Sequence, residues 1–198
     1  MKQILINASQ REELRLAIVE DNKLAELDID LPSKNIKSNI YKGTISRVEP
    51  SLEAAFVNFG RSRHGFLPFK EISPDIFIPG KQKSSRDCIE SGKEIVVQID
   101  KEERGSKGAA LSTFLSLAGK YLVLLPKNPN TGGVSRRLEG NDRLVAKKLL
   151  SEMNIPDGMS VILRTSGLDT NKETLEWDMN YLIQIFESIL ESSVLKKA

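Results

Sequence analysis

The sequence predicts an α+β protein, in which a five-stranded β-barrel of the OB type follows an N-terminal β-hairpin and precedes a small α/β region that ends in a long helix. Three patterns favour this fold class. Short strand-like runs separated by turn residues succeed one another between residues 40 and 117, strand and helix patterns alternate after residue 118, and an apolar stripe at helical spacing lies near the end of the chain. With 198 residues, 39% of them hydrophobic, the chain can bury the core of one large domain or two small ones.

The first segment, residues 1–36, is predicted to contain the hairpin. Asp21-Asn22 is a typical turn pair, and Leu31-Pro32-Ser33 breaks the strand pattern. The extended candidates are residues 3–7, 14–19 and 23–30.

The second segment, residues 37–117, is predicted to form the barrel. Its candidate strands are residues 41–48, 54–59, 65–69, 94–100 and 109–117. Residues 73–91 hold several proline and glycine residues and the cations Lys81, Lys83 and Arg86, which predicts a solvated basic loop. Five strands with a long loop after the third suit a small Greek-key barrel.

The third segment, residues 118–198, alternates strands with helices. Strands are expected at residues 121–125 and 160–163, a turn-rich loop at 126–133, and a helix at 141–153 whose buried face includes Leu144, Val145, Leu149 and Met153. Asp169 or Thr170 is expected to cap the final helix. The apolar stripe of that helix consists of Leu175, Met179, Leu182, Ile183, Phe186, Ile189 and Leu190.

Composition excludes several classes of protein. The single cysteine, Cys88, rules out an internal disulfide and a thiolate cluster for zinc, and it lies in the long loop with no partner. The start of the chain lacks the apolar core of a signal peptide, and no stretch approaches the roughly 20 apolar residues that span a bilayer. We therefore expect a cytoplasmic protein that is not an integral membrane protein. The net charge of +2 means that any nucleic-acid surface must be a local patch.

Aromatic and basic residues are interleaved in the predicted barrel. Phenylalanines 56, 59, 66 and 69 lie close in sequence to arginine, lysine and histidine, as a platform for single-stranded nucleic acid requires. Alternation places Ala55, Val57 and Phe59 on one face of their strand and Phe56 with Asn58 on the other. Phe59 is therefore assigned to the core, while the pattern leaves both a surface and a core position open for Phe56.

A second constellation, Arg164-Thr165-Ser166-Gly167, follows a predicted strand and precedes a helix. An arginine fork and a neighbouring hydroxyl can bind phosphate oxygens. The loop 132–137, Gly-Gly-Val-Ser-Arg-Arg, adds backbone donors and two cations, which is typical of an anion nest. Alone, an Arg-Thr pair is also compatible with an ordinary surface.

Other residues that could carry chemistry are assigned to structure. His64 is the only histidine and no nucleophile elbow accompanies it, so a position on the barrel surface or plain packing is preferred to catalysis. Asp28 and Asp30 are interpreted as strand-end residues rather than metal ligands. Asp178-Met179-Asn180 resembles a magnesium motif, but residues two apart in a helix point in different directions, so this interpretation is rejected.

Four blocks of the sequence closely resemble the S1-type OB domain of the bacterial ribonuclease E/G family, and the similarity covers nearly the whole chain. The blocks are residues 40–43 (Ile-Tyr-Lys-Gly), 48–57 (Val-Glu-Pro-Ser-Leu-Glu-Ala-Ala-Phe-Val), 63–68 (Arg-His-Gly-Phe-Leu-Pro) and 98–108, from Gln-Ile-Asp-Lys to Lys-Gly. The resemblance implies that residues 1–36 belong to a ribonuclease-H-like subdomain. It also implies that residues 37–117 form an S1-type RNA-binding domain and residues 118–198 a 5′-sensor region.

The resemblance also implies two binding sites. Phe56 and Phe66 match positions that stack on single-stranded RNA, and Lys107 matches a backbone contact. Arg164 and Thr165 match the pair that binds a 5′-monophosphate in the family. Supporting positions in that sensor match Gly119, Val123 and Arg136. The implied partner is single-stranded RNA, preferably with a 5′-monophosphate.

The family consists of magnesium-dependent endoribonucleases, hydrolases that act in RNA processing and decay. The resemblance implies that the magnesium ligands and a zinc-bridging cysteine pair belong to a downstream part, so no catalytic residue, metal site or cofactor is assigned within these 198 residues. The remainder of such a ribonuclease chain and further copies of it are the other implied partners. We expect the present chain to bind RNA without cutting it. Two alternatives remain: a stand-alone S1-type RNA-binding protein and a non-catalytic interaction scaffold.

Overall fold

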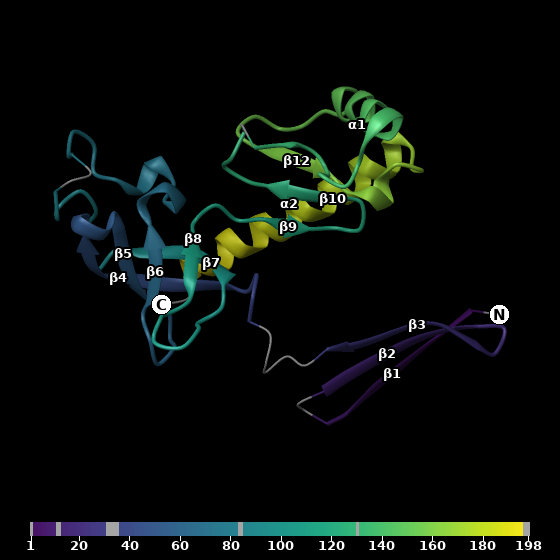
Figure 1. The fold of residues 1–198 in the computed structure, drawn as a ribbon, viewed down its shortest axis with the longest axis horizontal. Helices are drawn as coiled ribbons and strands as arrows, with labels where there is room; N and C mark the ends of the chain where they lie inside the picture. Colours follow the sequence, from purple (N-terminus) through teal and green to yellow (C-terminus); the bar gives the residue numbers. More distant parts are fainter. Residues whose placement is uncertain (1, 11–12, 31–35, 83–84, 130, 196–198) are drawn as a thin grey trace. The chain divides into compact units, whose positions relative to one another are not determined.

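The computed structural model describes residues 2–10, 13–30, 36–82, 85–129 and 131–195. By its internal contacts the chain divides into two units, Met1–Asn39 and Ile40–Ala198 (Figure 1). Each unit has its own sheet structure, and the candidate functional residues all lie in the second.

The first unit is an antiparallel sheet of three strands, which correspond to the three predicted extended stretches. Strands β1 (Lys2–Gln10), β2 (Glu13–Glu20) and β3 (Lys23–Asp30) pair in that order. The predicted turn is confirmed, because Asp21 and Asn22 both have positive φ angles, as the tight turn of a hairpin requires. Neighbouring residues Ile4 and Leu5, which point to opposite faces, are 62% and 55% exposed, so apolar side chains lie open on both faces of this sheet. The predicted chain break at 31–33 lies outside the described residues.

The second unit begins with a closed five-stranded barrel, as predicted. Its strands are β4 (Ile40–Glu49), β5 (Ala54–Asn58), β6 (Gly65–Pro68), β7 (Glu94–Lys101) and β8 (Ala110–Ser112), in the order β4-β5-β6-β8-β7. Only the pairing of β6 with β8 is parallel. Fully buried side chains that fill the barrel are Ile45, Val57, Leu67, Val97, Ile99 and Leu111. Alternation along each strand turns the intervening side chains outward.

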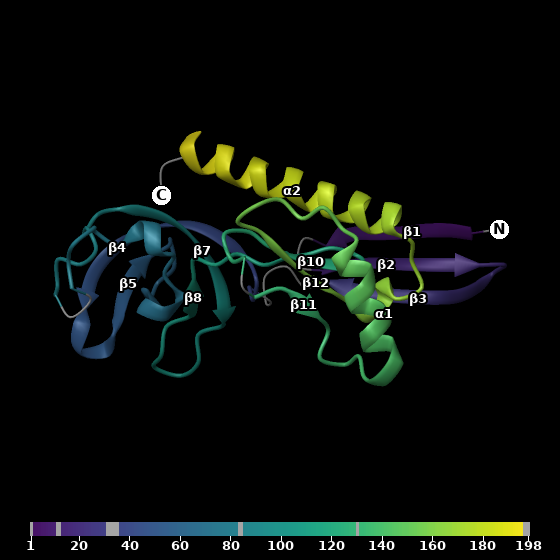
Figure 2. The ribbon, with the colours of Figure 1, turned by 90° about the horizontal axis from the view of Figure 1, so that it is seen from above.

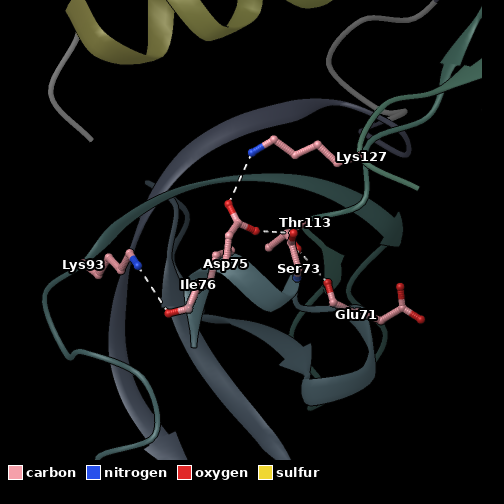
Figure 3. Close-up of polar contacts among 7 residues, drawn as sticks. All are labelled: Glu71, Ser73, Asp75, Ile76, Lys93, Thr113 and Lys127. Carbon is pink, nitrogen blue, oxygen red and sulfur yellow. Dashed lines mark hydrogen bonds and ion pairs between the residues drawn. The ribbon is translucent and has the colours of Figure 1, made fainter. Parts of the chain in front are cut away.

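The long segment after β6 is more ordered than the predicted solvated loop. Cys88 and Ile89 are buried in the core, and short 3₁₀ helices occupy Phe69–Glu71 and Pro74–Ile76. Figure 3 shows how this start of the segment is anchored: the hydroxyl of Thr113 donates to the carbonyl of Glu71 (2.9 Å) and accepts from the backbone N–H of Ser73 (2.7 Å). The predicted cations Lys81 and Arg86 are exposed, but the burial of Cys88 and Ile89 was not predicted, because Gly and Pro spacing reports chain reversals and not burial. Lys83 lies outside the described residues.

An ion pair connects this segment to the second half of the unit. Lys127 Nζ lies 3.4 Å from Asp75 Oδ2, and Lys93 Nζ donates to the carbonyl of Ile76 at 3.2 Å (Figure 3). The hydrogen bond from the Ser73 hydroxyl, followed by the charge of Lys127, holds the pKa of the Asp75 carboxyl below its ordinary value. Asp75 is therefore a charged surface anchor at neutral pH.

The second half of the unit is a four-stranded sheet with two helices. Strands β9 (Leu117–Ala118), β10 (Leu122–Leu125), β11 (Gly133–Val134) and β12 (Ser160–Leu163) lie in the order β11-β12-β10-β9. The single strand expected at 109–117 is in fact two short strands, β8 in the barrel and β9 in this sheet. Strand β11 falls in a stretch that was expected to be loop. It pairs in parallel with β12, whose paired residues lie 29 positions away in the sequence, a separation that local sequence patterns do not reveal.

Helix α1 (Gly140–Ser151) forms where predicted, and its buried face is predicted correctly only in part: Met153, just beyond the helix, is buried, as predicted. Leu144 is 65% exposed and Val145 is exposed, whereas Ala146 is fully buried. Leu149 and Leu150 pack against the core one turn later. The strand that α1 contacts, β11, was not expected, so the face that would meet it could not be chosen from hydrophobicity alone.

Helix α2 (Lys172–Leu195) runs along one face of the sheet and contacts β9 and β10 (Figure 2). The predicted apolar stripe is largely confirmed: Leu175, Met179, Leu182 and Phe186 are buried, and Leu190 is exposed. The predicted cap is displaced. Asn171 accepts a hydrogen bond from the N–H of Thr174 at 2.9 Å, which makes Asn171 the N-cap instead of Asp169 or Thr170. Within the described residues no helix is long and apolar enough to cross a membrane.

Replacing the cap residue, Asn171→Ala, is expected to lower the free energy of unfolding by about 1 kcal/mol, because the N–H of Thr174 loses its acceptor. Urea unfolding followed by the fluorescence of the single tryptophan, Trp177 on α2, measures this change. Asn180→Ala is the matched control, since Asn180 is exposed within the same helix. There alanine is the better helix former, so stability should stay constant or rise by up to about 0.7 kcal/mol. Equal losses in the two variants would contradict the cap.

Candidate functional site

Two aromatic rings lie side by side on the outside of the barrel. Phe56 on β5 and Phe66 on β6 are directly opposite in the strand register. Their ring centroids are 5.9 Å apart and the ring planes are inclined by 70°, an edge-to-face arrangement. Both side chains are half-buried, while their neighbours Ala55, Val57 and Leu67 are fully buried inside the barrel. The structure thus decides the question that alternation left open: Phe56 faces outward and Phe59, which is 5% exposed, belongs to the core.

Cations flank the aromatic pair along one row of paired residues. Arg47 on β4 lies opposite Phe56, and its guanidinium carbon is 4.7 Å from the centre of the Phe56 ring. On the other side, Phe66 pairs with Ala110, and Ala110 pairs with Lys101 on β7. Arg47 and Lys101 are both exposed. Lys101 was missed by sequence reasoning because a register shift near Asp100 precedes it, and such shifts leave no local signal.

Lys107 lies on the tight turn between β7 and β8, close to the same row. The turn is closed by paired hydrogen bonds between Arg104 and Lys107, both 3.1 Å, and the side chain of Arg63 donates to the carbonyl of Gly105. A Cβ atom at Gly108 would lie 2.2 Å from the carbonyl oxygen of His64, so only glycine lets the turn approach the start of β6 this closely. Phe56, Phe66 and Lys107 are therefore held on neighbouring parts of the barrel surface, which we call the barrel platform.

The contact of His64 with Ser46 has a structural explanation. Ser46 Oγ is 3.0 Å from His64 Nδ1 and also donates to the carbonyl of Phe56 at 3.0 Å. A hydroxyl has one proton, so this proton goes to the carbonyl, and Nδ1 is assigned as the donor to Ser46. A serine held in this way is not activated as a nucleophile. The pair connects the loop before β6 to the irregularity in β4 beside Phe56.

A second group of residues gathers at one edge of the four-stranded sheet. Strands β11 and β12 are parallel and adjacent, and Arg136 and Arg164 follow their respective carboxyl ends. The N–H of Ser135 donates to the carbonyl of Leu163 at 2.8 Å, which holds the carboxyl ends of the two strands together. Thr165 begins a short 3₁₀ helix directly after Arg164. Arg136, Arg164 and Thr165 are all exposed.

The turn between β9 and β10 completes this edge. The guanidinium of Arg164 donates to the carbonyl of Gly119, and its backbone N–H donates to the carbonyl of Tyr121 at 2.9 Å. Lys120 in the same turn is exposed, with its ammonium 4.9 Å from the centre of the Tyr121 ring. Contact with Tyr121 and, more weakly, the charge of Asp178 raise the pKa of Lys120 above its ordinary value. Lys120 therefore adds a third cation that sequence reasoning did not single out.

Val123 belongs to the outer face of the same sheet. It pairs with Ala118 on one side and Ile162 on the other, and Ile162 pairs with Gly133. The alternate residues Leu122, Leu124 and Leu163 are fully buried against the helices. The structure therefore brings Gly119 into contact with Arg164 and places Arg136 and Thr165 beyond neighbouring strand ends. We call the set Gly119, Val123, Arg136, Arg164 and Thr165 the phosphate pocket, a name taken only from the ligand that the sequence resemblance predicts for it.

Comparison with known proteins matches the two segments of the chain in which these residues lie. A family model described as S1 RNA binding domain matches residues 34–114, and one described as Ribonuclease E/G family matches residues 116–198. Ribonuclease E of Haemophilus influenzae is 51% identical over 203 residues, which cover 100% of this chain and 22% of that protein. Ribonuclease E of Escherichia coli is 50% identical over 203 residues, which cover 100% of this chain and 19% of that protein. The chain belongs to the ribonuclease E/G family.

A second branch of the ribonuclease E/G family is more distant. Ribonuclease G of Escherichia coli is 33% identical over 198 residues, covering 96% of this chain and 40% of that protein. The chain spans about a fifth of the length of the two ribonuclease E relatives. The matched S1 domain contains the whole barrel platform, and the matched ribonuclease E/G segment contains the whole phosphate pocket. The chain is thus homologous to the N-terminal S1 and 5′-sensor region of the family.

Metal ligation does not fit the residues that the structure describes. Among them, no group of three or more His, Cys, Asp or Glu side chains is placed to hold a metal ion.

Proposed function

We propose that this chain binds single-stranded RNA with a preference for a 5′-monophosphate end. Bases stack on Phe56 and Phe66, Lys107 contacts the backbone, and the phosphate pocket binds the terminal phosphate. The observation that carries the proposal is the row that runs from Arg47 through the paired phenylalanines to Lys101, because half-exposed rings between cations bind bases and phosphates together. This row lies within the segment that matches an S1 RNA binding domain.

The end preference rests on the arrangement of charge at the sheet edge. Arg164 and Arg136 supply planar donor forks, Thr165 supplies a hydroxyl, and Lys120 adds a point charge. No carboxylate is among the residues of the phosphate pocket. A terminal monophosphate carries more negative charge than an internal phosphodiester, and a 5′-hydroxyl carries none, so such a pocket favours processed RNA ends.

We propose that the longer protein, to whose N-terminal part this chain corresponds, is a cytoplasmic endoribonuclease that acts in RNA processing and decay. Its magnesium-dependent chemistry, its zinc bridge and its assembly into oligomers would then reside in segments other than the residues described here. The present chain would bind RNA and leave it uncut. Magnesium-dependent cleavage by the purified chain, abolished by substitutions within it, would contradict the proposal that cleavage resides in other segments.

The proposal is tested by fluorescence anisotropy with a short, unstructured RNA that carries either a 5′-monophosphate or a 5′-hydroxyl, at one fixed salt concentration. We expect tighter binding of the monophosphorylated RNA and much weaker binding of a double-stranded RNA of the same length. Equal binding of both single strands would leave a stand-alone S1-type RNA binder. Binding of neither would favour an interaction scaffold.

Lys107→Ala is expected to reduce the salt dependence of binding. Each phosphate contact of a single strand releases counterions, so losing one contact should make the slope of log K against log salt shallower by about 0.7. Titrations at several salt concentrations measure this slope. Lys147→Ala is the control, because Lys147 is exposed on α1 and outside both sites. Identical slopes for native protein and Lys107→Ala would remove Lys107 from the platform.

A further inference from the structure

A buried carboxylate lies directly beneath the phosphate pocket. Asp178 on α2 is only 3% exposed, although it occupies the helix face that carries Leu175 and Leu182. Burying a charge in an apolar core is costly unless hydrogen bonds compensate for the lost hydration. Three successive backbone N–H groups supply that compensation. Asp178 Oδ1 accepts from Lys120 at 3.2 Å, and Oδ2 accepts from Tyr121 and from Leu122, both at 2.9 Å.

The opposite side of the same turn is bonded to the phosphate pocket. The carbonyl of Gly119 accepts from the guanidinium of Arg164, and the carbonyl of Tyr121 accepts from the backbone N–H of Arg164. The carbonyl between them, that of Lys120, accepts from the hydroxyl of Ser166 at 2.6 Å. The turn is thus held from two sides: its N–H groups bind the carboxylate of α2, and its carbonyl groups bind the segment that carries Arg164.

The glycine at position 119 has a second role in this arrangement. A Cβ atom there would lie 2.6 Å from Asp178 Oδ2 and 2.8 Å from Oδ1, closer than real Cβ atoms come. Glycine therefore allows the turn to approach the carboxylate closely enough for the three hydrogen bonds. The requirement for glycine at this position follows from the contact with α2 and not only from space for a ligand.

We propose that Asp178 is a positioning residue of the phosphate pocket, which fixes the Gly119–Leu122 turn and, through the Gly119 carbonyl, the orientation of the Arg164 guanidinium. The inference rests on the proposed binding of a 5′-monophosphate by that pocket. Asp178 itself does not touch the RNA. Its carboxylate oxygens accept from the three N–H groups and not from Arg164, so the guanidinium keeps its remaining donors for phosphate oxygens.

The test compares the two RNA ends on native protein and on Asp178→Asn, in the full 198-residue chain, by fluorescence anisotropy. An amide nitrogen cannot accept, so at least one N–H of the turn loses its partner. We expect the preference for monophosphate over hydroxyl to fall about tenfold, the equivalent of one charge-assisted hydrogen bond. The affinity for the hydroxyl-ended RNA, which measures the barrel platform, should stay unchanged.

The sign of the effect separates positioning from simple electrostatics. Removing a negative charge near a phosphate would by itself strengthen phosphate binding, whereas loss of positioning weakens it. Asp169→Asn, which neutralises an exposed carboxylate two residues beyond Gly167, serves as the control and should leave the preference constant or raise it. Asp178→Glu keeps the charge, but its side chain is longer by one methylene and displaces the turn. It too should lower the preference for the monophosphate over the hydroxyl end.

The outcomes are distinct. If the native chain prefers the monophosphate and folded Asp178→Asn keeps that preference, the positioning role is overturned while the proposed function stands. If the native chain shows no preference, the phosphate pocket itself fails, and the positioning role fails with it. Should the variants not fold, hydrogen exchange on the native chain decides: the amides of residues 120–122 must exchange as slowly as core amides, and fast exchange overturns the inference.

Discussion

Phe56→Ala is expected to weaken binding of single-stranded RNA by about 1–3 kcal/mol, which corresponds to roughly 5- to 150-fold in Kd. The guanidinium carbon of Arg47 lies 4.7 Å from the centre of the Phe56 ring, and the Phe56 and Phe66 rings pack edge to face. These contacts hold it in one orientation in the free protein, so little conformational entropy is lost when a base stacks on it. The stability of the barrel should change little, because the core of β5 is formed by Ala55 and Val57.

Anisotropy titrations with the monophosphorylated and hydroxyl-ended RNAs measure this effect. Both RNAs should lose affinity by the same factor, because the substitution affects bases and not the 5′ end. Leu52→Ala is the matched control: Leu52 is an apolar barrel residue, 55% exposed, in the 3₁₀ helix before β5. Affinities within twofold of native for Phe56→Ala, or an equal loss for Leu52→Ala, would contradict the platform.

Arg164→Ala is expected to abolish discrimination between the two 5′ ends. Charge-assisted hydrogen bonds contribute about 1.5–3 kcal/mol each, so the affinity for monophosphorylated RNA should fall by at least about tenfold. The affinity for hydroxyl-ended RNA should remain that of the native chain. Arg164→Lys keeps the charge but not the planar fork that reaches both the Gly119 carbonyl and a phosphate, so an intermediate preference is expected.

Arg143→Ala is the matched control for the second prediction, since Arg143 is an exposed arginine on α1 outside the phosphate pocket. Its loss removes the same charge from the same unit and should lower both affinities equally and slightly. A preference that survives in Arg164→Ala would assign end recognition elsewhere. A uniform fall for both RNAs would make Arg164 an ordinary backbone contact.

Much of the barrel and its platform could be predicted from the sequence. The period-two alternation around Phe56 correctly separated the buried Ala55 and Val57 from the outward face, because a strand side chain points to one face or the other. The apolar stripe of α2 was also correct, since 3.6-residue periodicity is a local property. The pairing of Arg164 with Thr165 is visible in the sequence as well, and both lie together at the end of β12.

The sequence by itself therefore determined the α+β class, the core position of Phe59 and the residue types of both sites, whereas the outward position of Phe56 was decided by the structure. Only the tertiary structure decided which segments meet: β11 with β12, β9 with β10, and the carboxylate of Asp178 with the turn at Gly119. The sequence singled out Asp178 only as part of a magnesium-like motif, which was rejected. Its partners lie 56 to 58 residues away. Periodicity encodes the direction of a side chain within its own element, whereas contacts between distant elements depend on how the whole chain packs, which no local pattern records.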